Sequence, residues 1–267
     1  MADLPNALTI DLEPWMCLYE DLPLSLELDR GHLIESTKLL LDLLDKHHVK
    51  ATFFALGVVY QWYPNLIDHI ASRGHEIAFH GYTHLKLSKT ILGREILKSK
   101  NFLNRYSVNG FRAPQMYITS HDLKTLRSLG FTYDSSMYGL SKHFNTELGI
   151  KEVPVSTYPP KPRKKLIPPR TFMHALLNLE LPVGSGLCLA ILSVRFLNVA
   201  IRQINREGYP TILFIHPWQL LNPPASVVRT MSLPKMLYSL KISLEKLEHL
   251  LKTHNFTTIQ TLLKDFS

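Results

Sequence analysis

Cysteines are scarce in this sequence, and it contains no long uninterrupted apolar run. The chain of 267 residues has two cysteines, Cys17 and Cys188, neither in a Cys-x-x-Cys pair, which excludes a disulfide framework. The longest apolar run, residues 187–201, contains Arg195 and Asn198. A membrane-spanning helix needs about 20 apolar residues, so this run predicts a buried helix of the core and no transmembrane segment.

Repeats at solenoid periods and low-complexity tracts are also absent. Apolar residues make up 45% of the chain and charged residues 19%, which suits a complete core and excludes disorder. Composition marks no internal boundary, so we expect one domain over residues 1–267. The first residues, MADLPNALTIDLEPW, lack the basic and apolar segments of a signal peptide, which predicts a cytoplasmic protein.

Acidic residues are in deficit, with 22 Asp and Glu against 30 Lys and Arg, a net charge of +8. The densest basic stretch is Lys-Pro-Arg-Lys-Lys at residues 161–165, inside a proline-rich segment. It is either a solvated loop or a contact for an anionic partner such as a phosphate, an acidic sugar or a membrane surface. No helix carries a repeated basic face, so we do not expect a nucleic acid partner.

Short apolar runs alternate with helical patterns along the chain. The apolar runs predict strands at residues 7–10, 51–56, 76–80, 110–112, 131–133, 153–156 and 211–215. Helical spacing, with start and stop residues, predicts helices at residues 33–46, 63–73, 91–106, 121–129, 187–206 and 233–254. The alternation favours an α/β fold with a mainly parallel sheet. Six or seven strands suit an incomplete (β/α) barrel better than a complete eightfold one.

Ionisable residues follow four of the predicted strands. In parallel α/β folds, reactive groups gather at the carboxyl ends of the strands. The first strand ends in two carboxylates spaced two residues apart, and in extended backbone this spacing places both on one face. Grouped by strand, the residues are Asp11 with Glu13, His80 with His84, Arg112, and His216.

Each of these features alone has an ordinary explanation. With 13 histidines, some pairs arise by chance, and a carboxylate pair often forms only a turn or a helix cap. Together they match a facial metal site, in which two histidines and one carboxylate leave positions open for water and substrate. The second carboxylate is then free to act as general base and His216 as general acid. The third metal ligand can be either Glu13 or Asp11.

The order of the motifs resembles the polysaccharide deacetylase superfamily, that is, the NodB homology domain or carbohydrate esterase family four. The match runs over about residues 7–220, and its segment GHEIAFHGYTHLKL (74–87) is highly specific. The resembling segments are residues 9–13 (TIDLE), 50–57 (KATFFALG), 74–84, 110–114 (GFRAP), 130–136 (GFTYDSS), 152–156 (EVPVS) and 215–218 (IHPW). The last two resemble the branch linked to exopolysaccharide and surface-glycan synthesis.

The resemblance implies a distorted (β/α) barrel that holds a divalent metal ion, Zn²⁺ being the first choice. His80 and His84 match the two metal-binding histidines, and Asp11 matches the catalytic base. The family has two adjacent aspartates in its first motif, and here Leu12 takes the second place. Glu13 is then the expected third ligand, as in relatives with an acid-x-acid arrangement.

The remaining roles come from the same resemblance. Arg112 matches the residue that orients the base, and His216 matches the general acid. Asp134 matches the acidic residue that tunes the acid, and we expect it to lie near His216 and raise its pKa. Trp218 is expected either to stack on a sugar or to be a buried anchor, and Pro114 to lie on the substrate side.

The expected function is metal-dependent removal of N-acetyl or N-formyl groups from amino sugars. The substrate would be a surface polysaccharide or its lipid-linked precursor, handled at the inner membrane surface with peripheral contact through residues 161–165. One alternative is a small-amide or ureide hydrolase of the same fold. Another is a catalytically inactive glycan-binding module, although both Asp11 and His216 are present.

Overall fold

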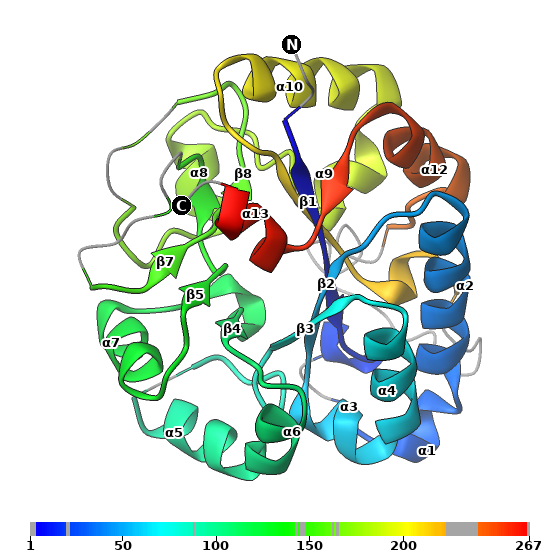
Figure 1. Cartoon of the computed structure of the whole chain (residues 1–267), viewed down its shortest axis with the longest axis vertical. Coiled ribbons are helices and arrows are strands. Elements are labelled where there is room, and N and C mark those ends of the chain that lie inside the picture. Colours follow the sequence, from blue (N-terminus) through cyan, green and yellow to red (C-terminus); the bar gives the residue numbers. More distant parts are fainter. Residues whose placement is uncertain are drawn as a thin grey trace.

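The computed structural model describes residues 4–19, 22–87, 89–141, 144, 148–161, 163, 166–222 and 240–265. Within these residues a parallel sheet is surrounded by helices (Figure 1). The strands are β1 (Asn6–Leu12), β2 (Thr52–Ala55), β3 (Glu76–Phe79), β4 (Gly110–Phe111), β5 (Tyr133–Asp134), β6 (Tyr138–Gly139), β7 (Lys151–Glu152), β8 (Val155–Ser156), β9 (Ile212–Ile215) and β10 (Phe256–Thr257).

The helices and helical turns alternate with these strands. They are η1 (Trp15–Leu18), α1 (Leu26–Asp29), α2 (His32–Lys46), α3 (Gly57–Trp62), α4 (Pro64–Ser72), α5 (Lys89–Lys98), α6 (Lys100–Arg105), η2 (Pro114–Met116), α7 (Ser120–Ser128), α8 (Phe172–Leu177), α9 (Gly186–Ile191), α10 (Val194–Arg206), η3 (Pro217–Gln219), α12 (Leu244–Thr253) and α13 (Ile259–Asp265).

The main sheet has eight strands, all paired in parallel, in the order β10-β1-β2-β3-β4-β5-β7, with β9 also beside β1. The strands β6 and β8 form a separate parallel pair. Every residue of β1, β2, β3 and β9 is buried, as expected for strands that helices cover. The strand–helix alternation and the curled parallel sheet confirm the predicted α/β class and its distorted, incomplete (β/α) barrel.

The central part of the chain forms this sheet because its apolar runs are short and flanked by helices with one apolar face. Helix α2 buries Leu33, Leu40, Leu41 and Leu44 in the core cluster that also contains Leu8, Ile10 and Phe53. Helix α4 begins with Pro64 at its first position and buries Leu66, Ile67 and Ile70. Both helices pack on the same side of the sheet as α12 (Figure 1).

Two predicted helices are shorter or broken in the structure. The predicted helix 187–206 is two helices, α9 and α10, because the Ser193 hydroxyl accepts the N–H of Phe196 at 3.2 Å and starts a new helix. The predicted helix 233–254 begins at Leu244, where Ser243 caps the N–H of Lys246 at 3.1 Å. Residues 233–239 of that prediction lie outside the described residues.

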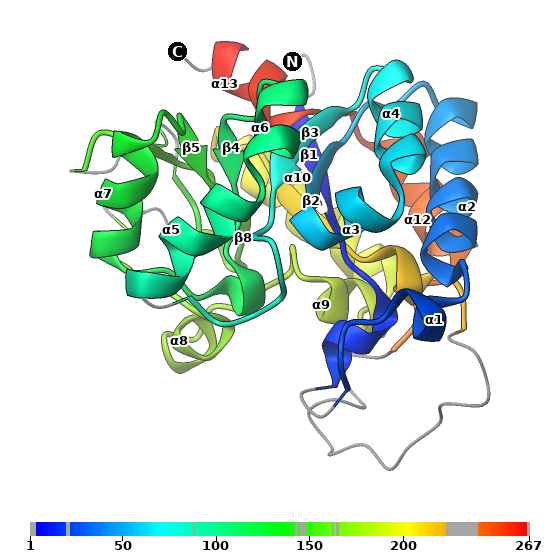
Figure 2. The same ribbon diagram turned by 90° about the horizontal axis from the view of Figure 1, so that it is seen from below.

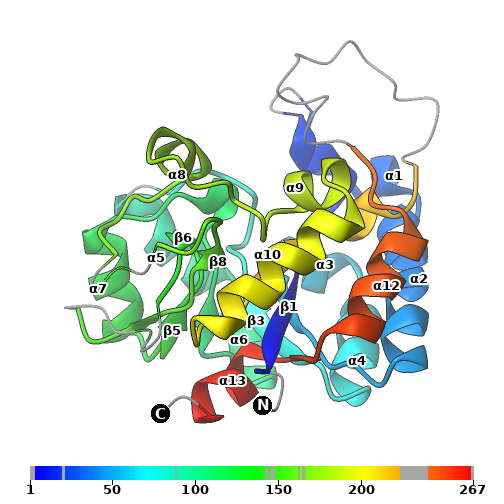
Figure 3. The same cartoon turned by 90° about the horizontal axis from the view of Figure 1, so that it is seen from above.

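The predicted helix 91–106 is also divided, into α5 and α6, at Ser99. Side views show α8, α9 and η1 at one end of the molecule, the end toward which β1 runs (Figures 2 and 3). None of the helices among the described residues combines the length and the apolar character that crossing a bilayer requires.

Candidate functional site

The carboxyl end of β1 carries two buried acids. Asp11 is the next-to-last residue of the strand, and the chain turns directly after it, since the Glu13 N–H donates to the Asp11 carbonyl at 3.0 Å. Leu12, between them, points into the apolar core. Both carboxylates face His216, whose Nε2 lies 3.9 Å from Asp11 Oδ2 and 3.5 Å from Glu13 Oε1. The predicted shared face of Asp11 and Glu13 is therefore confirmed.

The two histidines of the GHEIAFHGYTHLKL segment come from a strand end and the loop that follows. His80 directly follows β3, and the chain bends at Gly81, whose φ of +87° is a left-handed conformation that favours glycine. His84 lies four residues on, and the two ring centroids are 5.5 Å apart. Of the two geometries that HxxxH allows, the strand end with a tight loop is the one observed.

This loop is held by a residue that the sequence did not single out. Glu95 of α5 is buried, and one of its carboxylate oxygens accepts the N–H groups of Tyr82 at 2.7 Å and Thr83 at 2.6 Å. Glu95 thus fixes the backbone between His80 and His84. The predicted helix 91–106 gave no reason to expect this role. A single acid on the apolar side of a helix is nevertheless a sequence feature that could have indicated a buried carboxylate.

Glu13 connects the two histidines. Its Oε2 atom lies 2.8 Å from His84 Nε2 and 3.5 Å from His80 Nε2. His80 Nδ1 donates to the carbonyl oxygen of Arg112 at 2.8 Å, because a carbonyl can only accept, and this leaves Nε2 with its lone pair. Burial alone would raise the pKa of Glu13, but His84, His80 and His216 together hold it well below its usual range.

These residues fit a divalent metal ion. Within the described part of the chain, Glu13 Oε2 and His80 Nε2 are buried atoms that have no hydrogen-bond partner outside the group of Glu13, His80 and His84. Ligands about 2.0–2.1 Å from a tetrahedral zinc lie about 3.3 Å from one another, and the two distances from Glu13 bracket that value. The outward bond of His80 to a backbone carbonyl is also the usual way to orient a metal-binding imidazole.

A cysteine lies at the same place. Among the described residues, Glu13, Cys17 and His84 form a group whose possible ligand atoms all lie within 4.8 Å of one another. Cys17 belongs to the turn η1, which follows Glu13 by one residue, and it is half-buried. Neither the cysteine count nor a Cys-x-x-Cys motif points to Cys17 as a metal ligand. Its position four residues after Glu13 was the sequence feature that could have indicated a place at this site.

Arg112 is fully buried at the end of β4 and organises the base candidate. Its Nη1 donates to Asp11 Oδ1 at 2.7 Å and to Thr9 Oγ1 at 2.8 Å. Its Nε and Nη2 donate to the carbonyl and hydroxyl of Ser135 at 2.9 and 2.7 Å. The guanidinium also lies over the ring of Phe54, 4.2 Å from its centroid. Arg112 thus contacts Asp11 as the family resemblance implies.

His216 follows β9 and is held by its own turn. Gln219, a buried residue of η3, accepts the His216 backbone N–H at 3.0 Å and lies 3.2 Å from its Nδ1. The remaining nitrogen, Nε2, faces Asp11 and Glu13. Burial lowers the pKa of His216 and outweighs the opposite effects of Glu13, Asp11 and Gln219. The side chains of His216 and His84 are 14% and 15% exposed, so solvent reaches the site beside them.

Asp134 does not contact His216, and the prediction that it raises the pKa of His216 is wrong. Its carboxylate accepts the hydroxyl and N–H of Ser136 at 2.7 and 3.1 Å and is paired with Glu152. Both acids are completely buried, and burial raises the pKa of each, most strongly that of Glu152. The Ser136 hydroxyl in turn accepts the N–H of Ala113, so Asp134 supports the backbone after Arg112.

The two residues expected on the substrate side are both buried. The Trp218 indole is 4% exposed, packs with Trp15, Met16 and Tyr19, and stacks on the His216 imidazole at 4.4 Å between centroids. This is the buried anchor, the second of the two expected roles. Pro114 begins η2 and lies against Gly81, where an added Cβ would come within 3.3 Å of its ring.

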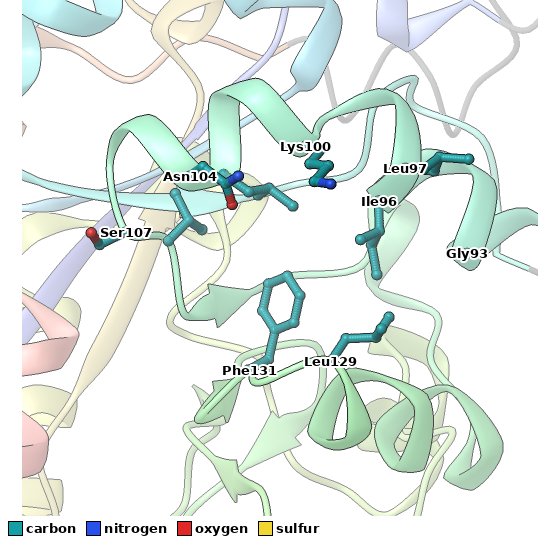
Figure 4. A pocket seen from close by; sticks show the side chains of 10 residues that line it. Gly93, Ile96, Leu97, Lys100, Asn104, Ser107, Leu129 and Phe131 are labelled. Carbon is teal, nitrogen blue, oxygen red and sulfur yellow. The ribbon is translucent and has the colours of Figure 1, made fainter.

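A separate groove lies on the outer surface, between α5, α6 and the loop after α7 (Figure 4). Its lining includes Leu97, Lys100, Leu129 and Phe131, and none of the residues discussed above. It contains no acid or histidine, so it offers neither a metal ligand nor a general base. The chemistry-bearing residues are therefore those at the strand ends.

Comparisons with known proteins agree with this geometry. Residues 19–133 match the family model for polysaccharide deacetylase, and residues 135–264 match a domain of unknown function, DUF3473. The boundary between the two falls at β5, inside the main sheet. Asp11 and Glu13 precede the first match, whereas His80, His84 and Arg112 lie within it and His216 lies within the second.

Two peptidoglycan-N-acetylglucosamine deacetylases from Bacillus cereus are similar to parts of the chain. One is 37% identical over 112 residues, which is 40% of this chain and 41% of the relative. The other is 30% identical over 131 residues, 45% of this chain and 62% of the relative. The chain thus spans less than two thirds of either relative. The chain is therefore similar to the polysaccharide deacetylase family over residues 19–133.

Solved structures show the same fold as this chain. A candidate polysaccharide deacetylase from Mycobacterium smegmatis aligns over 99% of this chain and 90% of its own, with 20% identity and a TM-score of 0.64. A family-four pseudoenzyme from Bacillus anthracis aligns over 98% of this chain and 66% of its own, with 15% identity and a TM-score of 0.51. Polysaccharide deacetylases are hydrolases of non-peptide carbon–nitrogen bonds.

Proposed function

We propose that this chain is a polysaccharide deacetylase family member that removes N-acetyl or N-formyl groups from amino sugars of a surface polysaccharide or its lipid-linked precursor. The observation that carries the proposal is the meeting of two acids and three histidines at the ends of β1, β3 and β9, with Arg112 bonded to one acid. Similar proteins include deacetylases of peptidoglycan N-acetylglucosamine and of chitooligosaccharides, which supports N-acetylated amino sugars as the substrate class.

Glu13, His80 and His84 would hold a divalent ion, for which we propose Zn²⁺. Such an ion supplies Lewis-acid polarisation of the acyl carbonyl and makes water easier to deprotonate. Two imidazoles and a carboxylate form a set that suits Zn²⁺ and related transition metals. The bond from Arg112 to Asp11 Oδ1 supports giving Asp11 a role other than that of a ligand.

Asp11 is the proposed general base. Arg112 occupies Oδ1, so Oδ2 is the atom that faces His216 and the open side of the site. The buried guanidinium favours the ionised form of the carboxylate, which must be free of a proton to accept one from the attacking water.

His216 is the proposed general acid. Its Nε2 atom lies opposite Asp11 Oδ2, and its backbone is fixed by β9 and by Gln219. An amine is a poor leaving group until its nitrogen is protonated, and an imidazole beside the open side of the site can deliver that proton. Trp218 supports the ring from behind by stacking on it.

Acetate release from a panel of N-acetylated glycans, with metal analysis of the same samples, tests the proposal. The wild type should release acetate and contain a divalent ion. Asp11→Asn should keep the metal and lose at least about a hundredfold in activity, the low end for a general base. Metal-bound wild type that hydrolyses no glycan in the panel would favour an inactive glycan-binding module. Such pseudoenzymes occur in this fold. Hydrolysis of small amides or ureides alone would favour the other alternative.

A further inference from the structure

We propose that Cys17 is an additional ligand of the metal site. This proposal rests on the proposed function in one respect, namely that Glu13 and His84 bind a metal ion. The observation is the mutual distance below 4.8 Å between the ligand atoms of Glu13, Cys17 and His84. A second observation is that Glu13 Oε2 is buried and, apart from the two imidazoles, has no hydrogen-bond partner in the described residues.

The local fold directs Cys17 to this place. The chain turns at Glu13 and Pro14, and the Cys17 N–H donates to the Pro14 carbonyl at 3.0 Å, which closes the turn η1 over the end of β1. Trp15 and Met16 are buried on one side of this turn, in a cluster with Trp218. Cys17 packs against the main core cluster instead, where it is half-buried and near Glu13.

A thiolate ligand would change what the site binds. On metal binding, the Cys17 thiol releases its proton to solvent and the sulfur forms the bond to the ion. Soft sulfur ligands favour zinc, cadmium and other thiophilic ions over magnesium, calcium or manganese. A side chain in this position also competes with water for the ion, since catalytic zinc sites otherwise keep one position open.

Cobalt titration of the metal-free full chain provides the test. Co²⁺ bound to a thiolate shows a sulfur-to-cobalt charge-transfer band in the near ultraviolet, and the chain has only two cysteines to assign it to. We expect the band in the wild type, its loss in Cys17→Ser and its retention in Cys188→Ser. Cys188 is a good control because it is buried in α9.

Three results would overturn the proposal, and they have different consequences for the metal centre. Cobalt that binds the wild type without the band, or a band that persists in Cys17→Ser, removes Cys17 from the site and leaves the three-residue centre intact. No cobalt binding at all, measured by equilibrium dialysis, would overturn the metal centre of the proposed function as well.

A different observation points to a membrane-docking surface around α8. Four large apolar side chains within 13 residues are mostly exposed: Ile167 (77%), Met173 (59%), Leu177 (77%) and Leu179 (80%). The opposite side of α8 is anchored, because Ala175 is buried and Phe172 packs edge-on against Tyr138. The exposed residues are thus displayed by a fixed helix and its flanking segments. We infer that they insert into the interface of an anionic lipid bilayer.

The charge around this surface favours anionic lipid. Residues 161–180 contain five Lys or Arg and one acid, Glu180. Glu180 is already neutralised by Arg163 at 2.7 Å and Arg170 at 2.6 Å. Lys161 reaches the carbonyl of Asn178 at 3.1 Å, next to Leu179, so a cation lies beside the exposed apolar side chains. Basic residues that flank exposed apolar residues are typical of interfacial membrane binding.

The position of α8 determines which end of the molecule would face the membrane. Figures 2 and 3 place α8 at the same end of the molecule as η1, which follows the end of β1. Docking through α8 would therefore turn the carboxyl ends of the strands toward the bilayer. The suggestion that a lipid-linked sugar is thereby presented rests on the proposed function, whereas membrane binding itself does not.

Vesicle co-sedimentation tests this surface without any assay of activity. We expect wild type to sediment with phosphatidylcholine vesicles that contain phosphatidylglycerol, and at least about tenfold less in 1 M salt, where charges are screened. The double variant Met173→Asp/Leu177→Asp should lose binding. Leu97→Asp/Leu129→Asp is the matched control, because these side chains are 72% and 51% exposed in the groove of Figure 4.

Several results would overturn the membrane assignment. One such result is wild type that remains in the supernatant with the vesicles that contain phosphatidylglycerol, and another is a control variant that loses binding as strongly as the α8 variant. Sedimentation velocity without vesicles tests whether a second copy of the chain binds this surface. A wild type that is dimeric, together with an α8 variant that is monomeric, would assign the surface to such a dimer.

Discussion

The backbone carbonyl of Arg112 accepts the Nδ1–H of His80 at 2.8 Å, while the Arg112 side chain donates to Asp11 at 2.7 Å. One residue thus orients a proposed metal ligand through its main chain and the proposed base through its guanidinium. This arrangement explains why a fully buried arginine is retained at the centre of the sheet. It also separates the roles of the two acids, since Asp11 is bonded to Arg112 and Glu13 faces the imidazoles.

Replacing Arg112 by methionine should strongly destabilise the fold. The change leaves Asp11 buried without its counter-ion and removes donors to Thr9 and Ser135. Removing one partner of a buried pair costs about 3–5 kcal/mol, measurable as a lower urea midpoint at unchanged slope. Arg105→Met is the control. It breaks a pair with Asp68 whose side chains are 53% and 41% exposed, and should change the midpoint little. Equal losses in both variants would contradict the structural role of the Asp11 contact.

Replacing Glu95 by glutamine should weaken metal binding although Glu95 offers no ligand atom to the ion. One oxygen of the Glu95 carboxylate holds the N–H groups of Tyr82 and Thr83, and an uncharged amide oxygen accepts such bonds more weakly. Residues that orient metal ligands typically contribute 10- to 100-fold in affinity, so we expect a loss of about that size. Isothermal titration with Zn²⁺ measures it. Unchanged affinity would show that the His80–His84 loop keeps its shape without this contact.

Much of the fold and part of the site follow from local sequence features. The apolar runs and the alternation of elements predict a parallel sheet, and the rule that side chains meet at carboxyl strand ends brings Asp11, Glu13, His80 and His216 together. These features are local, because a strand end and a two-residue spacing can be read within a few positions. The observed contacts of Glu13 with both histidines and His216 agree with that reasoning.

The features that sequence reasoning missed depend on distant pairing or on competing local signals. Asp134 pairs with Glu152, 18 residues away, and no local pattern distinguishes this partner from His216. Ser193 lies inside an apolar run that reads as one helix, but its hydroxyl starts a new one. Cys17 comes close to Glu13 and His84 only because η1 folds back over the end of β1.

The pair of buried acids predicts a pH-dependent stability. The pKa of Glu152 in the folded chain lies well above its usual 4.5, because it is buried and lies beside Asp134. Above pH 4.5 the folded state therefore holds a proton that the unfolded chain has released. Stability must fall as pH rises through the folded pKa, by about 1.4 kcal/mol per pH unit for one proton.

Glu152→Gln should remove this dependence, because the amide still donates to Asp134 and has no proton to lose. Urea unfolding at several pH values between 5 and 8 should show a flatter profile for the variant and higher stability than wild type at the alkaline end. Glu207→Gln, at an exposed position, should keep the wild-type slope. Identical slopes in wild type and Glu152→Gln would refute the shared proton.

Replacing His216 by alanine should separate proton donation from binding. If Nε2 delivers a proton to the departing nitrogen, kcat on an N-acetyl amide should fall by about 10²–10⁴-fold, while metal content stays unchanged. An ester releases an alcohol, which needs less protonation than an amine, so the same variant should lose much less activity on an O-acetyl substrate. The neighbouring contacts favour proton donation by Nε2, because His216 Nε2 faces Asp11 and Glu13 while Gln219 occupies Nδ1. Both substrates are measured on both proteins. An equal loss on ester and amide would mean that His216 positions the substrate, and reduced metal content would make it a ligand.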